Sequence, residues 1–228
     1  MPFGINDAHL CNKRKIMMNV AAFTCNPFQE NGYIISDETN ECIIIDPGCY
    51  TASEQQQYLD YIQQNNLKPV RLFNTHCHLD HICGNAILAK KFNLKLEAHQ
   101  GEKPVLDASP QHGAMYGFRF EESPAIEVFL AETDTVQFGN SELSILYTPG
   151  HSPASISFYS EKEKFVIGGD VLFLQSIGRT DLPGGDYDTL INSIQTQLFT
   201  LPDEVKVYSG HGPATTIGFE KMNNPFFV

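Results

Sequence analysis

Hydrophobic and polar positions alternate along the chain in a pattern that is typical of short β-strands separated by turns. In the first half, this pattern predicts strands at residues 20–24, 33–36, 42–46, 70–74 and 94–98. In the second half, it predicts strands at residues 127–130, 135–138, 143–148, 155–159, 164–167 and 204–208. We therefore expect two halves that are both rich in strands.

Apolar residues at helical spacing occupy several of the segments between these strands. Ser53 and Gln56 have the spacing of a capping box, and they open the first predicted helix. A second helix is predicted at residues 84–92, and a third begins with Asp188 as its N-cap. Residues 101–125 contain prolines and glycines among polar and aromatic residues, so we expect a loop insertion near the functional site.

The composition is that of a globular protein with a substantial core. Of the 228 residues, 42% are hydrophobic and 18% are charged, and we expect one domain over residues 17–228. Residues 1–16 lack an apolar signal-peptide core, and we expect them to be a disordered extension or the result of a misplaced start. No run of about 18 apolar residues occurs, which argues against a membrane protein. The formal net charge of -12 argues against nucleic acid as the main partner.

The cysteines point to a reducing environment. All six lie within the first 83 residues, and no two have C-x-x-C spacing. A disulfide framework is therefore not expected, and a cytoplasmic location is the default. Cys77 lies between two histidines on an extended segment, so its side chain should face away from theirs and serve packing.

The strongest candidate chemistry is an H-x-H-x-D-H motif at residues 76–81. It places His76, His78, Asp80 and His81 within six residues. This is more imidazole and carboxylate than a structural zinc site needs, and it includes no thiolate pair. The motif therefore fits two adjacent metal ions better than one.

Other candidate ligands follow separate predicted strands. Asp46, His76, His151, Asp170 and His211 each lie at or just past the carboxyl end of one. Five connections are therefore expected to converge on one edge, where site residues commonly gather. Asp46 is expected to support a ligand histidine from behind rather than to bind metal. The remaining histidines have no ligand-spaced neighbours and are interpreted as structural or solvated: His9, His99 and His112.

These motifs, taken in order, resemble the metallo-β-lactamase superfamily over roughly residues 18–228. Three further segments are similar to the glyoxalase II (hydroxyacylglutathione hydrolase-like) group, and most of all to its short, single-domain bacterial members: Gly168-Gly169-Asp170-Val171-Leu172-Phe173, Gly178-Arg179-Thr180-Asp181 and Gly210-His211-Gly212-Pro213-Ala214-Thr215. The resemblance implies an α+β fold, a four-layer αβ/βα sandwich.

The resemblance also implies a set of metal ligands. A first ion would be held by His76, His78 and His151, and a second by Asp80, His81 and His211, with Asp170 bridging the two. Two divalent ions per chain are therefore expected. Imidazole and carboxylate ligands favour zinc, and they also accept iron or manganese.

The activity that the resemblance implies is hydrolysis of a small-molecule thioester such as S-lactoylglutathione. Asp80 or Asp170 would orient the nucleophile that attacks the carbonyl carbon. Arg179 is the candidate contact for a substrate carboxylate, because an arginine fork binds a carboxylate bidentately. Alternatively, Arg179 pairs with Asp181 or Asp186 and braces its own loop. Gly212-Pro213 replaces the acidic-tyrosine pair usual in the larger glyoxalase II enzymes, which leaves glutathione recognition open.

Other functions are compatible with the same motifs. Persulfide dioxygenases share this scaffold and a similar Gly-Arg-Thr-Asp segment, but they use one iron ion, which His76, His151 and Asp170 would hold here. A lactonase or phosphodiesterase is a third possibility, and a non-catalytic metal-binding protein is a fourth. Metal stoichiometry and oxygen consumption distinguish the dioxygenase from the hydrolases. The sequence does not indicate an oligomeric state.

Overall fold

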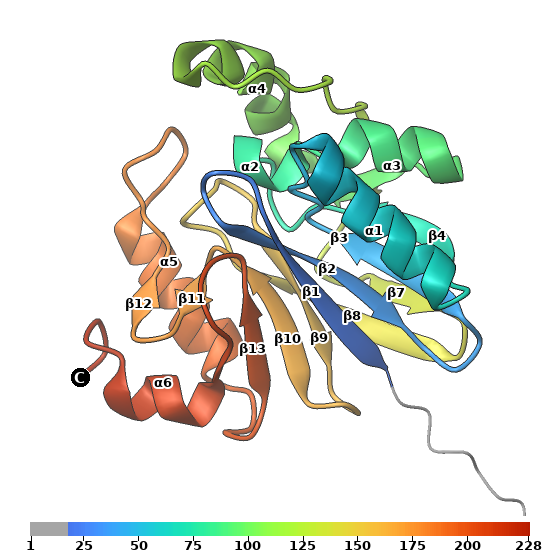
Figure 1. Ribbon diagram of the computed structural model, residues 1–228. Helices are drawn as coiled ribbons and strands as arrows, with labels where there is room; N and C mark the ends of the chain where they lie inside the picture. Colours follow the sequence, from blue (N-terminus) through green and yellow to red (C-terminus); the bar gives the residue numbers. More distant parts are fainter. Residues whose placement is uncertain (1–17) are drawn as a thin grey trace, which may run out of the picture.

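The computed structural model describes residues 18–228 and consists of two facing β-sheets with helices on their outer sides (Figure 1). This is the four-layer arrangement predicted from the sequence. The extension expected at residues 1–16 lies outside the described residues. No helix in residues 18–228 is long and apolar enough to cross a membrane.

The first sheet contains six strands in the order of the sequence. The first three strands pair antiparallel, and the last four, which share the third strand, pair parallel. The strands are β1 (Asn19–Cys25), β2 (Glu30–Ser36), β3 (Glu41–Ile45), β4 (Lys68–Phe73), β5 (Leu96–His99) and β6 (Ile126–Leu130).

The second sheet has the order β14-β13-β10-β9-β8-β7, and only β10 and β13 pair parallel. Its strands are β7 (Thr135–Phe138), β8 (Ser141–Tyr147), β9 (Ile156–Ser160), β10 (Phe165–Gly169), β13 (Lys206–Ser209) and β14 (Thr215–Thr216). A separate ribbon pairs β11 (Leu172–Phe173) with β12 (Ser176–Ile177). Every predicted strand is present with small shifts at its ends, whereas β11, β12 and β14 are too short for their pattern to have predicted them.

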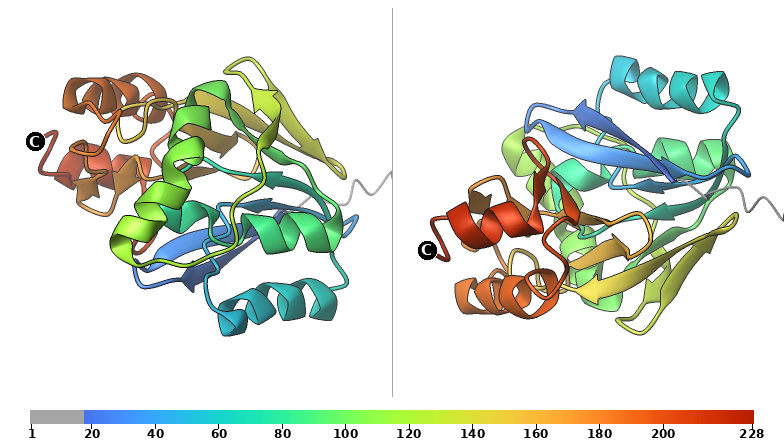
Figure 2. Two further views of the ribbon diagram at one scale, coloured as in Figure 1. Left: turned by 90° about the horizontal axis from the view of Figure 1, so that it is seen from above. Right: turned by 90° about the horizontal axis from the view of Figure 1, so that it is seen from below.

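Helices cover both outer faces (Figure 2). The first sheet is flanked by α1 (Ala52–Gln64) and α3 (Asn85–Phe92), and the second by α5 (Tyr187–Ser193), its π-helical continuation Ile194–Leu198, and α6 (Ile217–Asn223). A one-turn helix, α2 (Leu79–Ile82), lies within the histidine motif.

Two helix starts differ from the prediction. The capping box of α1 consists of Thr51 and Glu54: the Thr51 hydroxyl accepts from the Glu54 N–H at 3.2 Å, and the Glu54 carboxylate accepts from the Thr51 N–H at 2.7 Å. The expected pair, Ser53 and Gln56, is wrong because the helix begins two positions earlier. The N-cap of α5 is Asp186, whose carboxylate accepts from Thr189, rather than Asp188.

The prediction of a loop at residues 101–125 is also wrong, because more than half of this segment is helical. A 3-10 turn (Gln100–Glu102) leads into α4 (Lys103–Tyr116). Pro104 lies in the first turn, where a missing N–H costs nothing, whereas Pro110 lies inside the helix. Packing of the face that includes Val105 and Leu106 outweighs the proline and the glycines that hid the helix.

Three apolar clusters fill the spaces between the layers. The central cluster lies between the two sheets and includes Phe73 and Phe158, whose ring centroids are 5.2 Å apart. A second cluster lies between the first sheet and its helices, and a third between the second sheet and α5. Cys77 is fully buried in the second cluster, which confirms its packing role. All described cysteines, Cys25, Cys42, Cys49, Cys77 and Cys83, are free and buried.

Candidate metal centre

The loops that follow five strands meet at one edge of the sandwich. Asp46 follows β3, His76 follows β4, His151 follows β8, Asp170 follows β10 and His211 follows β13. The sheet pairings bring these strand ends together, and the distances below join their side chains directly. The predicted convergence is therefore confirmed.

Three histidines form a first group at this edge. His76, His78 and His151 each offer a ring nitrogen within 4.8 Å of the others, a spacing that one metal ion can bridge. Nδ1 of His78 lies 2.9 Å from Nε2 of His151. The three rings are nearly perpendicular to one another, and one nitrogen of each lies close enough to the others to share one ion.

A second group contains Asp80, His81 and His211, whose ligand atoms also lie within 4.8 Å of one another. Nε2 of His211 is 3.2 Å from the Asp80 carboxylate, and Nε2 of His81 is 3.8 Å from it. Helix α2 supplies two of these residues, so a single helical turn fixes their relative positions.

Asp170 lies between the two groups. Its Oδ2 is 3.4 Å from Nε2 of His151 and 3.4 Å from Nε2 of His211. Its Oδ1 is 3.5 Å from Nε2 of His81. One carboxylate thus faces both groups at once. Gly210 is essential to this approach, because a Cβ at that position would collide with Oδ1 of Asp170.

The Nδ1 atoms of His151 and His211 are held by backbone carbonyl oxygens. Nδ1 of His151 donates to the Arg179 carbonyl at 2.7 Å, and Nδ1 of His211 donates to the Phe28 carbonyl at 3.1 Å. Each bond fixes the tautomer and leaves Nε2 with a free lone pair that faces the centre.

Asp46 serves two further histidines, as predicted. Its Oδ2 accepts from Nδ1 of His81 at 3.2 Å and from the Thr75 hydroxyl at 2.5 Å. The Thr75 oxygen in turn lies 3.0 Å from Nδ1 of His76. Because the Thr75 proton goes to Asp46, its lone pair can accept from His76. Nε2 of both histidines is again left facing the centre.

The electrostatics of the two groups differ. Burial lowers the pKa of His76, His78 and His151, and that of His78 falls to about 3. These imidazoles are therefore neutral at pH 7, the form that binds metal. In the second group, burial opposes protonation of His211, yet the carboxylates of Asp170 and Asp80 raise its pKa to about 9. The carboxylates thus favour positive charge at this position.

Several buried atoms of the centre have no hydrogen-bond partner. They include Nε2 of His76, Nε2 of His81 and Oδ1 of Asp170. An unpaired buried polar atom costs about 1–3 kcal/mol, so such atoms point to a missing partner. Lone pairs on imidazole and carboxylate that face one another suit divalent cations. The residues therefore fit two adjacent metal ions.

A buried glutamate that the sequence did not reveal joins the two segments that carry the first ligand group. Glu102 is fully buried and accepts from the Cys77 N–H at 2.9 Å, the Ala154 N–H at 2.9 Å and the Ser152 hydroxyl at 2.8 Å. It therefore connects the segment that carries His76 and His78 to the segment that carries His151. Because Glu102 lies within residues 101–125, which were expected to form a loop, its sequence context did not indicate this supporting role.

Asn31 is a second supporting residue that the sequence analysis missed. Its side-chain amide donates to the carbonyls of Ser209 and Gly212, at 3.2 and 2.8 Å, and its backbone N–H donates to the Gly210 carbonyl at 2.7 Å. These three bonds surround His211. Asn31-Gly32 has the sequence of a turn, yet both residues lie in β2, and nothing in the local sequence indicates that the partners of Asn31 lie about 180 residues away.

We expect Asn31→Ala to weaken metal binding at the second group selectively. Loss of two amide donors frees the segment 209–212, and supporting partners of this kind contribute about 10–100-fold to metal affinity. Titration of metal-free protein with zinc against a chromophoric chelator should show one zinc ion bound with lower affinity and one bound with unchanged affinity. Asn65→Ala, which removes an exposed amide on α1, is the matched control. Equal affinities in the variant and the wild type would contradict this role.

The remaining residues considered in the sequence analysis are not among the convergent side chains. The Arg179 guanidinium forms a bidentate pair with Asp181, both bonds at 2.7 Å, while Asp186 caps α5 instead. His99 accepts from the Gly101 N–H and packs on Tyr147. His112 is half-buried in α4. His9 lies outside the described residues.

Comparison with known proteins agrees with this geometry. Over 203 residues the chain is 40% identical to the Bacillus subtilis protein named "Probable metallo-hydrolase YqgX", a match that covers 88% of this chain and 93% of that one. It is 35% identical over 216 residues to "Hydroxyacylglutathione hydrolase GloC" of Haemophilus influenzae, covering 92% and 98%. The crystal structure of TTHA1623 in a di-iron-bound form superimposes with a TM-score of 0.82 at 34% identity, covering 91% and 100%.

A family model also matches most of the chain. The model described as "Metallo-beta-lactamase superfamily" matches residues 25–211, a range that includes the six side chains of the two ligand groups and Asp170. The match, the four-layer fold and the ordered ligand groups together show that this chain belongs to the metallo-β-lactamase superfamily of metal-dependent hydrolases.

Proposed function

We propose that this protein is a binuclear metal hydrolase that cleaves a thioester. The observation that carries the proposal is the position of Asp170, whose carboxylate lies 3.4 Å from a histidine nitrogen of each ligand group. In this proposal His76, His78 and His151 would hold one ion, Asp80, His81 and His211 would hold the other, and Asp170 would be a ligand to both. Zinc is the favoured metal, with iron and manganese as alternatives. The di-iron form of TTHA1623 supports iron as an alternative.

A pair of bound divalent ions would supply Lewis acidity and would lower the pKa of a coordinated water molecule to about 7. The protein's own residues then set the geometry. The carboxylates of Asp80 and Asp170 lie 3.2 and 3.4 Å from Nε2 of His211, and either can accept a hydrogen bond from an attacking water and so orient it. The Asp46, Phe28 and Arg179 oxygens hold the imidazoles in fixed tautomers, so little rearrangement accompanies the reaction.

A thioester suits this centre better than an oxygen ester or an amide. The convergent side chains are histidines and aspartates that the ions would occupy, so no separate acid is left to protonate a leaving group. A thiol has a pKa of about 8.5 and departs as thiolate with little acid assistance. The likeness to GloC, named as a hydroxyacylglutathione hydrolase, supports the same class of substrate. We therefore propose a small-molecule thioester as the partner.

Metal analysis combined with a substrate panel tests this function. Protein purified without added metal should contain two ions per chain and should release thiol from S-lactoylglutathione or from N-acetylcysteamine thioesters. One iron per chain with oxygen uptake on glutathione persulfide would instead indicate a dioxygenase. Two ions with turnover only on lactones or phosphodiesters would also overturn the thioesterase assignment.

Arg179 is proposed to contact a substrate carboxylate on the side of the first ligand group. Its backbone carbonyl is fixed by His151, so its side chain begins beside that group. Both side chains of the Arg179–Asp181 pair are exposed. Exposed ion pairs contribute at most about 1 kcal/mol to stability, so a substrate carboxylate can replace Asp181.

We expect Arg179→Ala to raise the KM for S-lactoylglutathione by about tenfold, because a charge-assisted bidentate pair contributes about 1.5–3 kcal/mol. The KM for S-acetyl-N-acetylcysteamine, which carries no carboxylate, should not change. Steady-state kinetics on both substrates measure this difference. Equal effects on the two substrates, or no effect on either, would show that Arg179 only braces its own loop.

The location of the protein is proposed to be cytoplasmic. Five buried, free thiols support a reducing environment, since the described part of the chain contains no disulfide.

A further inference from the structure

We propose that an aromatic wall formed by Phe28, Tyr50 and Phe118 binds the acyl group of the substrate, and that this enzyme therefore prefers thioesters with an apolar, preferably aromatic, acyl group. This inference rests on the proposed thioesterase function and adds a substrate class to it. It stands on the attachment of the wall to the second ligand group, on the exposed Phe28 side chain and on the half-buried Tyr50 and Phe118 side chains that pack beside it.

Phe28 is fixed directly beside the second ligand group. It lies in the turn between β1 and β2, and its carbonyl accepts from Nδ1 of His211 at 3.1 Å. In the same turn, the Asn26 amide donates to the Asp80 carbonyl oxygen at 3.0 Å and accepts from the Phe28 N–H at 3.0 Å. The turn is thus bound to two residues of this group, yet the Phe28 side chain is 45% exposed.

Phe118 extends this surface from the opposite element. It follows Gly117, the αL residue that ends α4, and its ring packs against two others. The Phe118 and Tyr50 centroids are 4.2 Å apart in a stacked arrangement, and the Phe118 and Phe28 centroids are 5.4 Å apart. The Tyr50 hydroxyl is tied to the backbone by the Arg119 N–H at 3.4 Å. Three rings from three loops therefore form one continuous apolar surface.

The end of α4 carries further exposed apolar side chains. Met115 is 75% exposed and Tyr116 is 65% exposed. Seen from above, α4 lies across the junction of the two halves (Figure 2). Large apolar side chains that gather at one place on a surface commonly mark a binding site. The attachment of Phe28 to His211 places the wall beside the second ligand group, which makes the substrate the occupant that the structure favours.

The wall also separates the two ends of a thioester. Arg179 lies on the His151 side of the centre, whereas Phe28 lies on the His211 side. A thiol that carries a carboxylate would extend towards the arginine, so the acyl group would extend towards the rings. None of the three rings carries a charge, and an uncharged acyl group fits them.

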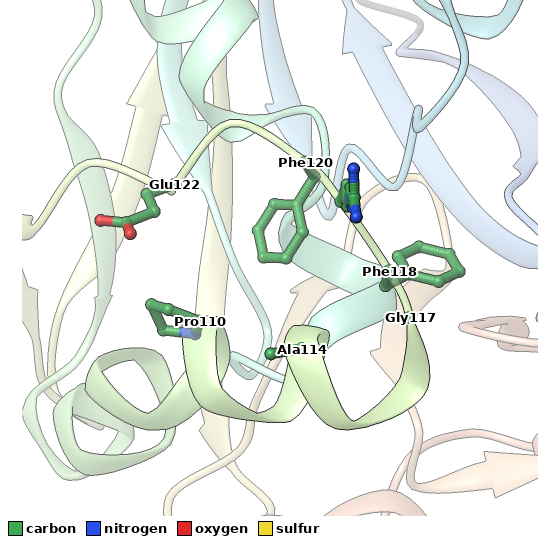
Figure 3. A pocket seen from close by; sticks show the side chains of 7 residues that line it. Pro110, Ala114, Gly117, Phe118, Phe120 and Glu122 are labelled. Carbon is green, nitrogen blue, oxygen red and sulfur yellow. The ribbon is translucent and has the colours of Figure 1, made fainter.

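A pocket of about 390 Å³ adjoins this wall, between α4 and residues 117–122 (Figure 3). Phe118 belongs both to the wall and to the lining of this pocket, which also includes Pro110, Ala114, Phe120 and Glu122. No convergent histidine or aspartate lines the pocket. The acyl surface proposed here is therefore the side of Phe118 that packs against Tyr50 and Phe28, beside the second ligand group.

The test compares two acyl groups on one thiol. The kcat/KM values for S-phenylacetyl- and S-acetyl-N-acetylcysteamine are measured with wild type, Phe118→Ala, Phe118→Leu and the control Phe129→Ala, which removes a ring that is 49% exposed on β6. We expect the wild type and the control to prefer phenylacetyl by about tenfold, a ratio consistent with one aromatic contact. The ratio should fall towards one in Phe118→Ala, with an intermediate value in Phe118→Leu.

Calorimetry separates failure of this inference from failure of the proposed function. The corresponding thioethers, with the carbonyl replaced by a methylene, cannot be hydrolysed, and their binding does not depend on turnover. Tighter binding of the phenyl-bearing thioether by wild type than by Phe118→Ala supports the wall even if no thioester is cleaved. A preference ratio and thioether affinities that are the same in wild type and in both Phe118 variants would overturn the inference while leaving thioester hydrolysis intact.

Discussion

Replacing Asp170 with alanine is expected to lower kcat/KM for thioester hydrolysis by about 10³-fold or more and to reduce the bound metal from two ions to one per chain. The carboxylate lies 3.4 Å from histidine nitrogens of both ligand groups. Its removal would take a ligand from each ion and would remove the one carboxylate that faces both groups. Loss of one electrostatic contact in a centre of this kind costs about 10²–10³ in rate, and Asp170 supplies more than one.

Elemental analysis and steady-state kinetics on the same preparation check this expectation. Circular dichroism shows whether the variant folds, and Asp170→Asn keeps the shape of the side chain while removing its charge. The matched control is Asp60→Ala, which removes an exposed carboxylate on α1. Retention of two ions and of activity within tenfold of wild type would refute the bridging role of Asp170.

Glu102→Gln is expected to destabilise the protein by about 2–3 kcal/mol although it changes only one oxygen to an NH₂ group. Oε1 of Glu102 accepts from the Ala154 N–H, and Oε2 accepts from the Cys77 N–H. A carboxamide must therefore place its NH₂ against one of these two donors, whichever way it is turned. Both bonds are buried, so no water can relieve the conflict.

The measured consequence should be a lower melting temperature of the metal-free protein. For a chain of this size, each kcal/mol corresponds to about 2–4 °C. Because Cys77 lies between His76 and His78, we also expect the affinity of the first ligand group for zinc to fall by about 10–100-fold. Glu127→Gln, at an exposed position on β6, is the control. A melting temperature within about 1 °C of wild type would contradict this account of Glu102.

Much of the fold followed from local patterns. Short strands such as residues 70–74 and 155–159 were predictable because alternation of apolar side chains is a property of each strand alone. Helix α4 was not, because Pro110 and Gly113 oppose a helix locally, and only the packing of its buried face against α2 and the second cluster compensates. The capping residues of α1 and α5 were missed by two positions, since adjacent Ser, Thr and Asp residues can all serve as N-caps.

The sequence by itself determined which side chains could bind metal and in what order they follow the strands, because imidazole and carboxylate ligands have a chemistry that does not depend on the fold. His76, Asp170 and His211 could be identified in this way. Apart from Asp46, the residues that support them were decided by the tertiary structure alone. Glu102 and Asn31 act through hydrogen bonds to segments about 50 and 180 residues away, and Phe28, Tyr50 and Phe118 meet only because three loops converge. Such contacts depend on distances in space, and no local pattern of residues encodes them.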